Sequence, residues 1–299
     1  MASVSTDSLG LGLALALVLG LGLGLGVSGC AANRGVPAAM LGWNDPFPPF
    51  RVAGNIYYVG TNELAQFLVT TPAGHVLLDS GFEAKVPRLR ANVEALGFRF
   101  GDIKILISSH AHIDHVQGHA EVRRLTGARV LASKEDAAVI ASGGKGDWAY
   151  RGAFSWTPCP VDEVIDDGAR VELGGAVLVA HATPGHTRGA TTWTTTVRED
   201  GRTLAVVFFP SATVPPGARL VDNQDFPTVV EAYERSFAVW RSLPCDIFLG
   251  SHGWFFGLAA KARRLAAGER PNPFIDRAGY ALAIDESERK LRATVESQR

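Results

Sequence analysis

The sequence predicts an α/β fold in which two mixed sheets pack face to face and helices cover their outer sides. Two observations support this prediction. Short runs of apolar and β-branched residues, typical of strands, alternate with amphipathic segments of helical length, and this order occurs in both halves of the chain. Histidine-containing loops follow apolar runs in both halves, so the halves are expected to meet at one edge of the sheets.

The expected elements follow from this alternation. In the first half we expect strands at 55–60, 66–71, 75–78, 103–107 and 129–132, and helices at 83–96, 119–126 and 134–141. A glycine-rich loop is expected at 143–157. In the second half we expect strands at 161–165, 170–173, 177–181, 191–197, 203–209 and 246–249. Helices are expected there at 229–243, at 258–267 and from about 276 onward.

The composition is that of a globular protein. The 299 residues are 46% hydrophobic and 20% charged, and the formal net charge is −1. A chain of this length can bury a large core. The charge balance gives no indication of a nucleic-acid-binding surface.

The first thirty residues differ from the rest. Residues 9–27 contain only Leu, Gly, Ala and Val, and the many glycines disfavour a permanent membrane-spanning helix. We therefore interpret residues 1–29 as a signal peptide, 30–50 as a linker and 51–299 as the folded domain. Val-Ser-Gly-Cys at 27–30 resembles a bacterial lipobox, which implies a periplasmic protein anchored to the outer membrane through a lipidated Cys30. An ordinary cleavage site beside a chance cysteine is the alternative.

The most informative segment is a loop directly after the apolar run 103–107. Within six residues it contains three imidazoles and one carboxylate, namely His110, His112, Asp114 and His115. These are ligand types that zinc prefers. His186 and His252 also follow apolar runs and complete six ligands, three for each metal of a two-zinc site. Surface or capping histidines are the alternative, which the close spacing argues against.

Several other polar residues allow two interpretations or have structural roles. Asp79 follows an apolar strand, where it either orients a ligand histidine or caps a turn. Three further histidines are expected to be structural: His75, His119 and His181. Cys159 and Cys245 could pair in an oxidising compartment, but nothing in the sequence brings them together.

The order of these ligands resembles that of the metallo-β-lactamase superfamily. Further segments resemble the third subclass of the class B β-lactamases: 58–61, 70–75, 77–81, 143–147, 211–214 and 251–253. The resemblance implies an αββα sandwich with two Zn²⁺ ions at one edge. It assigns His110, His112 and His186 to the first zinc. It assigns Asp114, His115 and His252 to the second.

Position 211 distinguishes members of this family. The first subclass has a Cys there, and the hydroxyacylglutathione hydrolases have an Asp that bridges both metals. The neutral Ser211 of this chain leaves His115 to complete the second site, as in the third subclass. The resemblance also implies that Ser211 and Thr213 bind the substrate carboxylate, unless both are ordinary turn hydroxyls. Three positions beside the metal loops depart from the family pattern and leave the substrate preference open: Gln117, Arg188 and Pro210.

The resemblance implies hydrolysis of the β-lactam amide bond in penicillins, cephalosporins and carbapenems, and hence antibiotic resistance. Two zinc ions would activate a water molecule, and Asp114 would act as the catalytic residue that orients the zinc-bound hydroxide. Trp148 and Tyr150, with Phe154 and Trp156, would line the substrate pocket or else cover the core. A lactone or thioester hydrolase and a non-catalytic binding protein are the alternatives. The complete ligand set argues against the latter.

Overall fold

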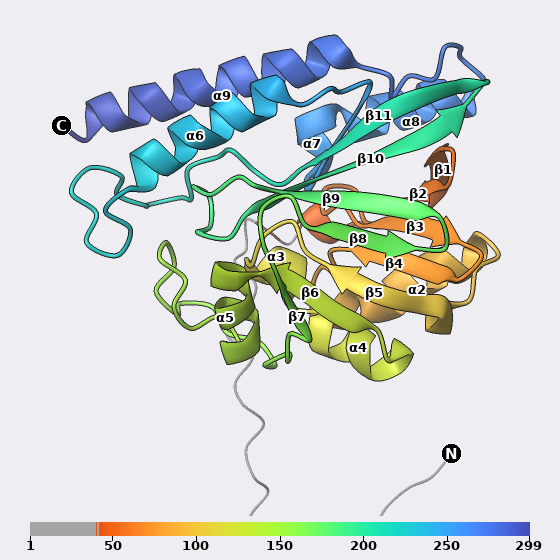
Figure 1. Ribbon diagram of the computed structural model, residues 1–299, viewed down its shortest axis with the longest axis horizontal. Helices are drawn as coiled ribbons and strands as arrows, with labels where there is room; N and C mark the ends of the chain where they lie inside the picture. The colour runs from red at the N-terminus through yellow and green to blue at the C-terminus, as the bar shows by residue number, and fades with distance from the viewer. Residues whose placement is uncertain (1–39, 41) are drawn as a thin grey trace, which may run out of the picture. The chain divides into compact units, whose positions relative to one another are not determined.

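Two β-sheets form the centre of the protein, with helices on both outer sides (Figure 1). The computed structural model describes Met40 and residues 42–299. The expected signal peptide, the lipobox and Cys30 lie outside the described residues. The predicted αββα sandwich is confirmed.

The first sheet contains seven strands in chain order. Its first four strands pair antiparallel, and the fourth to seventh pair parallel. Parallel pairing brings the carboxyl ends of neighbouring strands to the same edge of the sheet. The strands are β1 (Phe50–Ala53), β2 (Ile56–Tyr58), β3 (Phe67–Thr71), β4 (Gly74–Leu78), β5 (Ile103–Ile107), β6 (Arg129–Ser133) and β7 (Glu163–Ile165).

The second sheet contains five strands in the order β12-β11-β10-β9-β8. All neighbours pair antiparallel except β11 and β12, which are parallel. The strands are β8 (Arg170–Leu173), β9 (Ala176–Ala182), β10 (Thr191–Glu199), β11 (Arg202–Phe209) and β12 (Ile247–Gly250).

The helices cover the two sheets from outside. On the side of the first sheet lie α2 (Val86–Ala95), α4 (His119–Thr126) and α5 (Lys134–Ser142). On the side of the second lie α6 (Val229–Ser242) and α9 (Arg277–Ser297), which pack side by side (Figure 1). The other α-helices of residues 42–299 are α3 (Ile113–Val116), α7 (Gly253–Phe256) and α8 (Leu258–Ala266). The same residues contain three 3₁₀ turns: Gly42–Asn44, Glu83–Lys85 and Phe100–Asp102.

Alternating side chains of the first sheet fill two different cores. In β4, Val76 and Leu78 belong to the core that contains side chains of both sheets, whereas Leu77 packs in the core with α2. Successive residues of a strand point to opposite faces, so both faces of this sheet must be apolar. This explains why its central strands contain unbroken apolar runs, at 76–78 and 105–107.

Most expected elements are present, and the differences are short. The sequence prediction omitted β1, α3 and α7, each of four residues. Part of the expected linker packs on the domain: the Thr61 hydroxyl donates to the carbonyl of Trp43 at 2.7 Å, and the Phe47 ring lies 5.7 Å from that of Tyr58. The folded domain therefore begins before residue 51.

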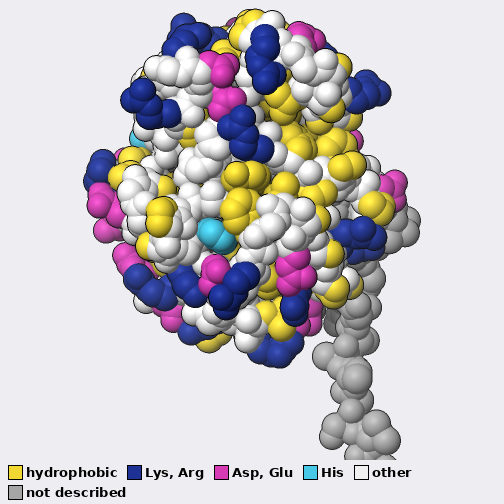
Figure 2. Space-filling model, turned by 90° about the vertical axis from the view of Figure 1, so that its right-hand side faces the viewer, with side chains coloured by type: hydrophobic (Ala, Val, Ile, Leu, Met, Phe, Trp, Pro, Cys, Tyr) yellow, Lys and Arg dark blue, Asp and Glu magenta, His cyan; other side chains and the backbone are white. Residues whose placement is uncertain are grey.

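Acidic and basic side chains are interspersed among hydrophobic ones on the face of the protein shown in Figure 2. None of the helices in the described residues combines the length and apolar character needed to cross a membrane.

Cys159 is buried beneath the first sheet and Cys245 packs at the second, and the two are not paired with each other.

Candidate metal centre

Three loops at one edge of the sandwich bring the six predicted ligands together. The loop after β5 and the short helix α3 that follows it carry four of them. His186 follows β9 and His252 follows β12, so each sheet contributes to the centre. The six side chains form two buried groups, His110, His112 and His186 in one and Asp114, His115 and His252 in the other. In each group the three potential ligand atoms lie within 4.8 Å of one another.

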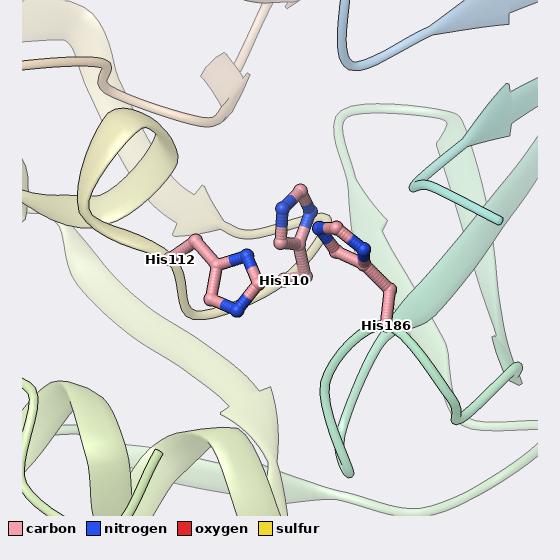
Figure 3. Close-up of side chains that lie close together, drawn as sticks. All are labelled: His110, His112 and His186. Carbon is pink, nitrogen blue, oxygen red and sulfur yellow. The ribbon is translucent and has the colours of Figure 1, made fainter. Parts of the chain in front are cut away.

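The imidazole rings of the first triad face a common point (Figure 3). The ring centroids of His110 and His186 are 4.7 Å apart, and those of His112 and His186 are 4.5 Å apart. The second triad is adjacent, because the rings of His110 and His115 are only 4.1 Å apart. The predicted division into two neighbouring triads therefore matches the geometry.

Hydrogen bonds fix which nitrogen of His110 and His186 is free. His186 Nδ1 donates to the carbonyl of Thr213 at 2.7 Å, which leaves a lone pair on Nε2. The Ser109 hydroxyl donates to Asp79 at 2.7 Å and therefore accepts from His110 Nδ1 at 3.0 Å. His110 Nε2 is buried without a hydrogen-bond partner among the described residues. A buried lone pair with no donor is the arrangement expected of a metal ligand.

The carboxylate of Asp147 lies beside the imidazole of His112. The His112 Nε2 lies 3.1 Å from Asp147 Oδ2, close in distance although not well aligned as a hydrogen bond. The Asp147 Oδ1 accepts from the backbone N–H of Tyr150 at 2.6 Å, which fixes the carboxylate. His112 Nδ1 thus remains for the metal. The Tyr150 ring lies 4.9 Å from that of His112.

The second triad has the spacing of a tetrahedral zinc site. His115 Nε2 lies 3.2 Å from His252 Nε2 and 3.3 Å from Asp114 Oδ2, and the third edge of the triangle is 3.7 Å. Two ligands of a tetrahedral zinc with Zn–N near 2.1 Å are about 3.4 Å apart. His115 Nδ1 donates to Asp79 at 3.1 Å, so its Nε2 presents a lone pair toward this triangle. The residues present therefore fit a zinc ion.

Asp79 connects both triads, as the sequence suggested for an orienting carboxylate. It accepts from the backbone N–H and the hydroxyl of Ser109, both at 2.7 Å, and from His115 Nδ1. It holds His115 directly and His110 through Ser109. Asp79 has a φ of 62°, a left-handed conformation that aspartate tolerates better than most residues.

Burial and mutual repulsion keep most ligand histidines neutral. Burial lowers the pKa of His186 to about 3, aided by His112, and it lowers the pKa of His110 and of His252 well below the usual range. His115 differs: burial lowers its pKa, but Asp114 and Asp79 raise it to about 10. The two carboxylates that favour a proton on His115 equally favour a metal cation there.

The predicted substrate-binding hydroxyls have different exposures. Thr213 is exposed, and its carbonyl accepts from His186 and from the hydroxyl of Tyr233. Ser211 is 1% exposed; its Oγ lies 3.0 Å from Thr213 Oγ1 and accepts from the Thr213 N–H at 3.2 Å. Thr213 is thus open to a ligand, whereas Ser211 orders the turn that presents it.

The aromatic residues of the 143–157 loop also differ in how far they are exposed. The resemblance placed Trp148 in the pocket wall, with a cover of the core as the alternative; it is 3% exposed, and its indole N–H donates to the carbonyl of His186 at 3.2 Å. It therefore supports the metal loop from the core. Tyr150 is half-buried beside His112 and 5.0 Å from Phe154. Phe154 and Trp156 pack near Ile113, which lies between two ligands.

Four residues near the metal centre were not predicted from the sequence to belong to it. Asp136 is buried and accepts hydrogen bonds from both ligand loops, and Asp147 holds His112. The Trp254 ring stacks on the His252 ring at 4.1 Å, and the Trp43 ring lies 5.1 Å from that of Trp254. The acidic residues lay in helix and loop segments with no sign of their long-range contacts.

The remaining predicted residues lie outside both triads. His181 bonds to Thr194 and His119 to Ser80, and the ring of His75 packs at 5.2 Å from that of Phe98. Each of the three residues that depart from the family pattern contacts another part of the fold. Gln117 accepts from the Glu83 N–H, Arg188 lies over the Phe226 ring, and the carbonyl of Pro210 accepts from the Ser251 hydroxyl.

Comparisons with known proteins agree with this geometry. A family profile described as the metallo-beta-lactamase superfamily matches residues 65–195. The native FEZ-1 metallo-beta-lactamase from Legionella gormanii is 46% identical, with a TM-score of 0.84 and coverage of 85% of this chain and 98% of that one. The class B3 di-zinc metallo-beta-lactamase LRA-12 from an Alaskan soil metagenome is 31% identical, with a TM-score of 0.80 and coverage of 85% and 96%.

Curated relatives match a shorter region. A hydroxyacylglutathione hydrolase from Fuscovulum blasticum is 33% identical over 95 residues, which is 32% of this chain and 29% of that protein. The match thus spans less than a third of the length of this relative.

Fold and site together define a metal-binding hydrolase, with two His/Asp triads at the edge of an αββα sandwich. The chain belongs to the metallo-β-lactamase superfamily, and its similarity to solved structures includes subclass B3 enzymes over nearly their whole length.

Proposed function

We propose that this protein is a β-lactamase that uses two zinc ions to hydrolyse the amide bond of penicillins, cephalosporins and carbapenems. The near-complete match to the FEZ-1 β-lactamase supports this activity more strongly than the partial match to a hydroxyacylglutathione hydrolase. The substrate is a small molecule, and the resulting phenotype is antibiotic resistance.

One observation carries the choice between these activities. The turn after β11 carries the buried, neutral Ser211 and the exposed residue Thr213, and Asp114 is the only carboxylate in either triad of the described residues. A second carboxylate bridging the two metals, which the resemblance implies for hydroxyacylglutathione hydrolases, is not part of these triads. A hydroxyl-bearing turn suits the carboxylate of a β-lactam, because it can donate hydrogen bonds to an anion.

The bound metal ions would supply an activated water and a Lewis acid for the lactam carbonyl. The protein contributes the orientation of the groups around them. Asp79 fixes the tautomer of His115 and, through Ser109, that of His110. Although burial raises the pKa of Asp114, His115 and His252 lower it far below its usual range, so this carboxylate stays ionised and can accept a hydrogen bond from the attacking water.

Residues at the rim position the substrate. The exposed Thr213 donates to the substrate carboxylate, with its turn held by Ser211, Tyr233 and His186. Tyr150 borders the first triad from the opposite loop. Burial, together with Asp114 and Asp147, raises the pKa of Tyr150 above its ordinary value, so it remains a neutral phenol that offers an apolar ring and one donor.

A direct assay tests the activity. The purified zinc-loaded protein is incubated with a penicillin, a cephalosporin and a carbapenem, with and without a chelator, and with a lactone and a glutathione thioester in parallel. We expect chelator-sensitive opening of the β-lactam ring. Turnover of the thioester or the lactone without any β-lactam hydrolysis would reassign the enzyme to the alternative hydrolase classes. Zinc binding without turnover of any of them would favour the non-catalytic alternative.

We also propose that the enzyme is exported and held at the outer membrane through a lipidated Cys30. The apolar run 9–27 and the lipobox-like sequence at 27–30 support this location.

A further inference from the structure

A single buried carboxylate joins the two loops that form the first triad. Asp136 lies in the first turn of α5 and is 2% exposed. Its Oδ2 accepts from the backbone N–H of Ala111 at 2.8 Å and from the hydroxyl of Thr187 at 3.0 Å. Its Oδ1 accepts from the backbone N–H of Gly189 at 3.0 Å.

The three donors are placed next to metal ligands. Ala111 lies between His110 and His112, and Thr187 follows His186 directly. The first loop leaves the first sheet after β5, whereas the second leaves the second sheet after β9. One carboxylate therefore sets the separation of two segments that come from different sheets and carry all three ligands of the triad.

The backbone of Gly189 lies so close to the start of α5 that a residue with a side chain would not fit at position 189. A Cβ on Gly189 would lie 2.6 Å from Asp136 Oδ1 and would overlap the hydroxyl of Ser133. That hydroxyl donates to the carbonyl of Gly189 at 2.6 Å, so the start of α5 holds both polar groups of this residue. The loop bearing His186 is consequently fastened to α5.

We propose that Asp136 is a positioning residue that holds the loop of His110 and His112 at a fixed distance from the loop of His186, and thereby sets the zinc affinity of the first site. The proposal rests on zinc binding by the first triad, which belongs to the proposed function, but not on the identity of the substrate.

The chemistry requires a carboxylate at this position. The Asp136 side chain faces three donors, and a carboxylate is the side chain that accepts through both of its oxygens. An amide of the same shape places its NH₂ against either the Gly189 N–H or the Ala111 and Thr187 donors. One loop is then released, and the ligands of the triad move relative to one another.

The test compares zinc affinity in three variants. Asp136→Asn changes the carboxylate, and Thr187→Val removes one donor while it keeps the shape and the charge. Asp246→Asn is the matched control, because Asp246 also is buried and accepts a backbone N–H, from Ala205 at 2.8 Å, but contributes to neither triad. The affinity of each site is measured by competition with a chelator, and cobalt substitution reports the geometry of the first site through its absorption spectrum.

We expect Asp136→Asn to weaken zinc binding at the first site about 10–100-fold, as for other partners that orient metal ligands, with an altered cobalt spectrum. Thr187→Val should give a smaller loss at the same site, and Asp246→Asn none. The proposal is overturned if Asp136→Asn has the same zinc affinity at the first site and the same cobalt spectrum as the wild type. If Asp136→Asn does not fold, the Thr187→Val variant is the test. Unchanged zinc affinity and an unchanged cobalt spectrum at its first site then overturn the proposal.

Turnover of β-lactams by the wild type is measured alongside. A wild type that binds zinc but hydrolyses no β-lactam contradicts the proposed function and leaves the role of Asp136 to be judged from the affinities alone.

Discussion

Replacing Asp79 by asparagine tests whether hydrogen bonds set the metal-binding form of the histidines. Asparagine keeps the side-chain shape and tolerates the left-handed backbone at this position, where φ is 62°. The carboxylate accepts from the N–H and O–H of Ser109 and from His115 Nδ1. In either orientation, the new NH₂ group faces at least one of these donors.

The expected magnitude follows from the lost bonds. A hydrogen bond to a charged group contributes roughly 1.5–3 kcal/mol, and a buried donor left without a partner costs about as much. Asp79 is 1% exposed, so water cannot replace the lost acceptor. We expect unfolding free energy to fall by about 2–3 kcal/mol and zinc affinity at the second site to fall about 10–100-fold. The second site should suffer more than the first, because His115 bonds to Asp79 directly and His110 only through Ser109.

The assay combines urea unfolding with zinc titration against a chelator. Asp200→Asn is a matched control: it is the same substitution at another left-handed aspartate, with φ of 49°, in the exposed turn between β10 and β11. If Asp79→Asn binds zinc at both sites as tightly as Asp200→Asn does, the orienting role of Asp79 is refuted.

Four further predictions concern single residues. His186→Ala should leave the first site incomplete and reduce turnover greatly; two bound zinc ions with full activity would contradict its assignment as a ligand. Thr213→Val should raise KM more than Ser211→Ala, since only Thr213 is exposed and a hydrogen bond to a carboxylate contributes about 1.5–3 kcal/mol; a changed zinc content would show a metal-site role instead. Burial lowers the pKa of His119 from 6.5 to about 3, so the folded state binds fewer protons than the unfolded state in that window. Stability of the chelator-treated protein should fall as pH drops below 6.5, by up to about 1.4 kcal/mol per pH unit from this group, and His119→Gln should lessen the slope in urea unfolding at pH 5–7; an equal slope would exclude the effect. Cys30→Ser should release the enzyme from the membrane fraction with zinc chemistry intact, whereas an unmodified mature N-terminus in mass spectra of the wild type would rule out the anchor.

The ligands could be predicted because their chemistry is concentrated in the sequence. Four of the six ligands lie between His110 and His115, and His186 and His252 follow strands whose apolar runs are easy to recognise. The strands themselves were predictable, since buried β-branched runs ended by glycine or polar residues have few alternative structures. Their packing at one edge then followed from the order of elements.

The supporting residues could not be predicted, because their role depends on contacts distant in sequence. Asp136 follows Lys134 and Glu135 and looks like an ordinary acidic residue in the first turn of a helix. Trp148 stands in a glycine-rich loop, where an aromatic ring suggests a pocket wall, yet it bonds to a residue 38 positions away. The four-residue helix α3 is too short to show a helical period.

Both triads draw ligands from the two sheets. The first takes two ligands from the loop after β5 and one from the loop after β9, and the second takes two from α3 and one from the loop after β12. A metal bound by either triad is therefore a cross-link between the halves of the chain, and its binding adds to the free energy of unfolding by mass action. We expect the amount of intact enzyme in a cell to follow the zinc supply of its compartment. Where zinc is scarce, the edge at which the sheets meet loses both cross-links, and proteases gain access to the opened chain.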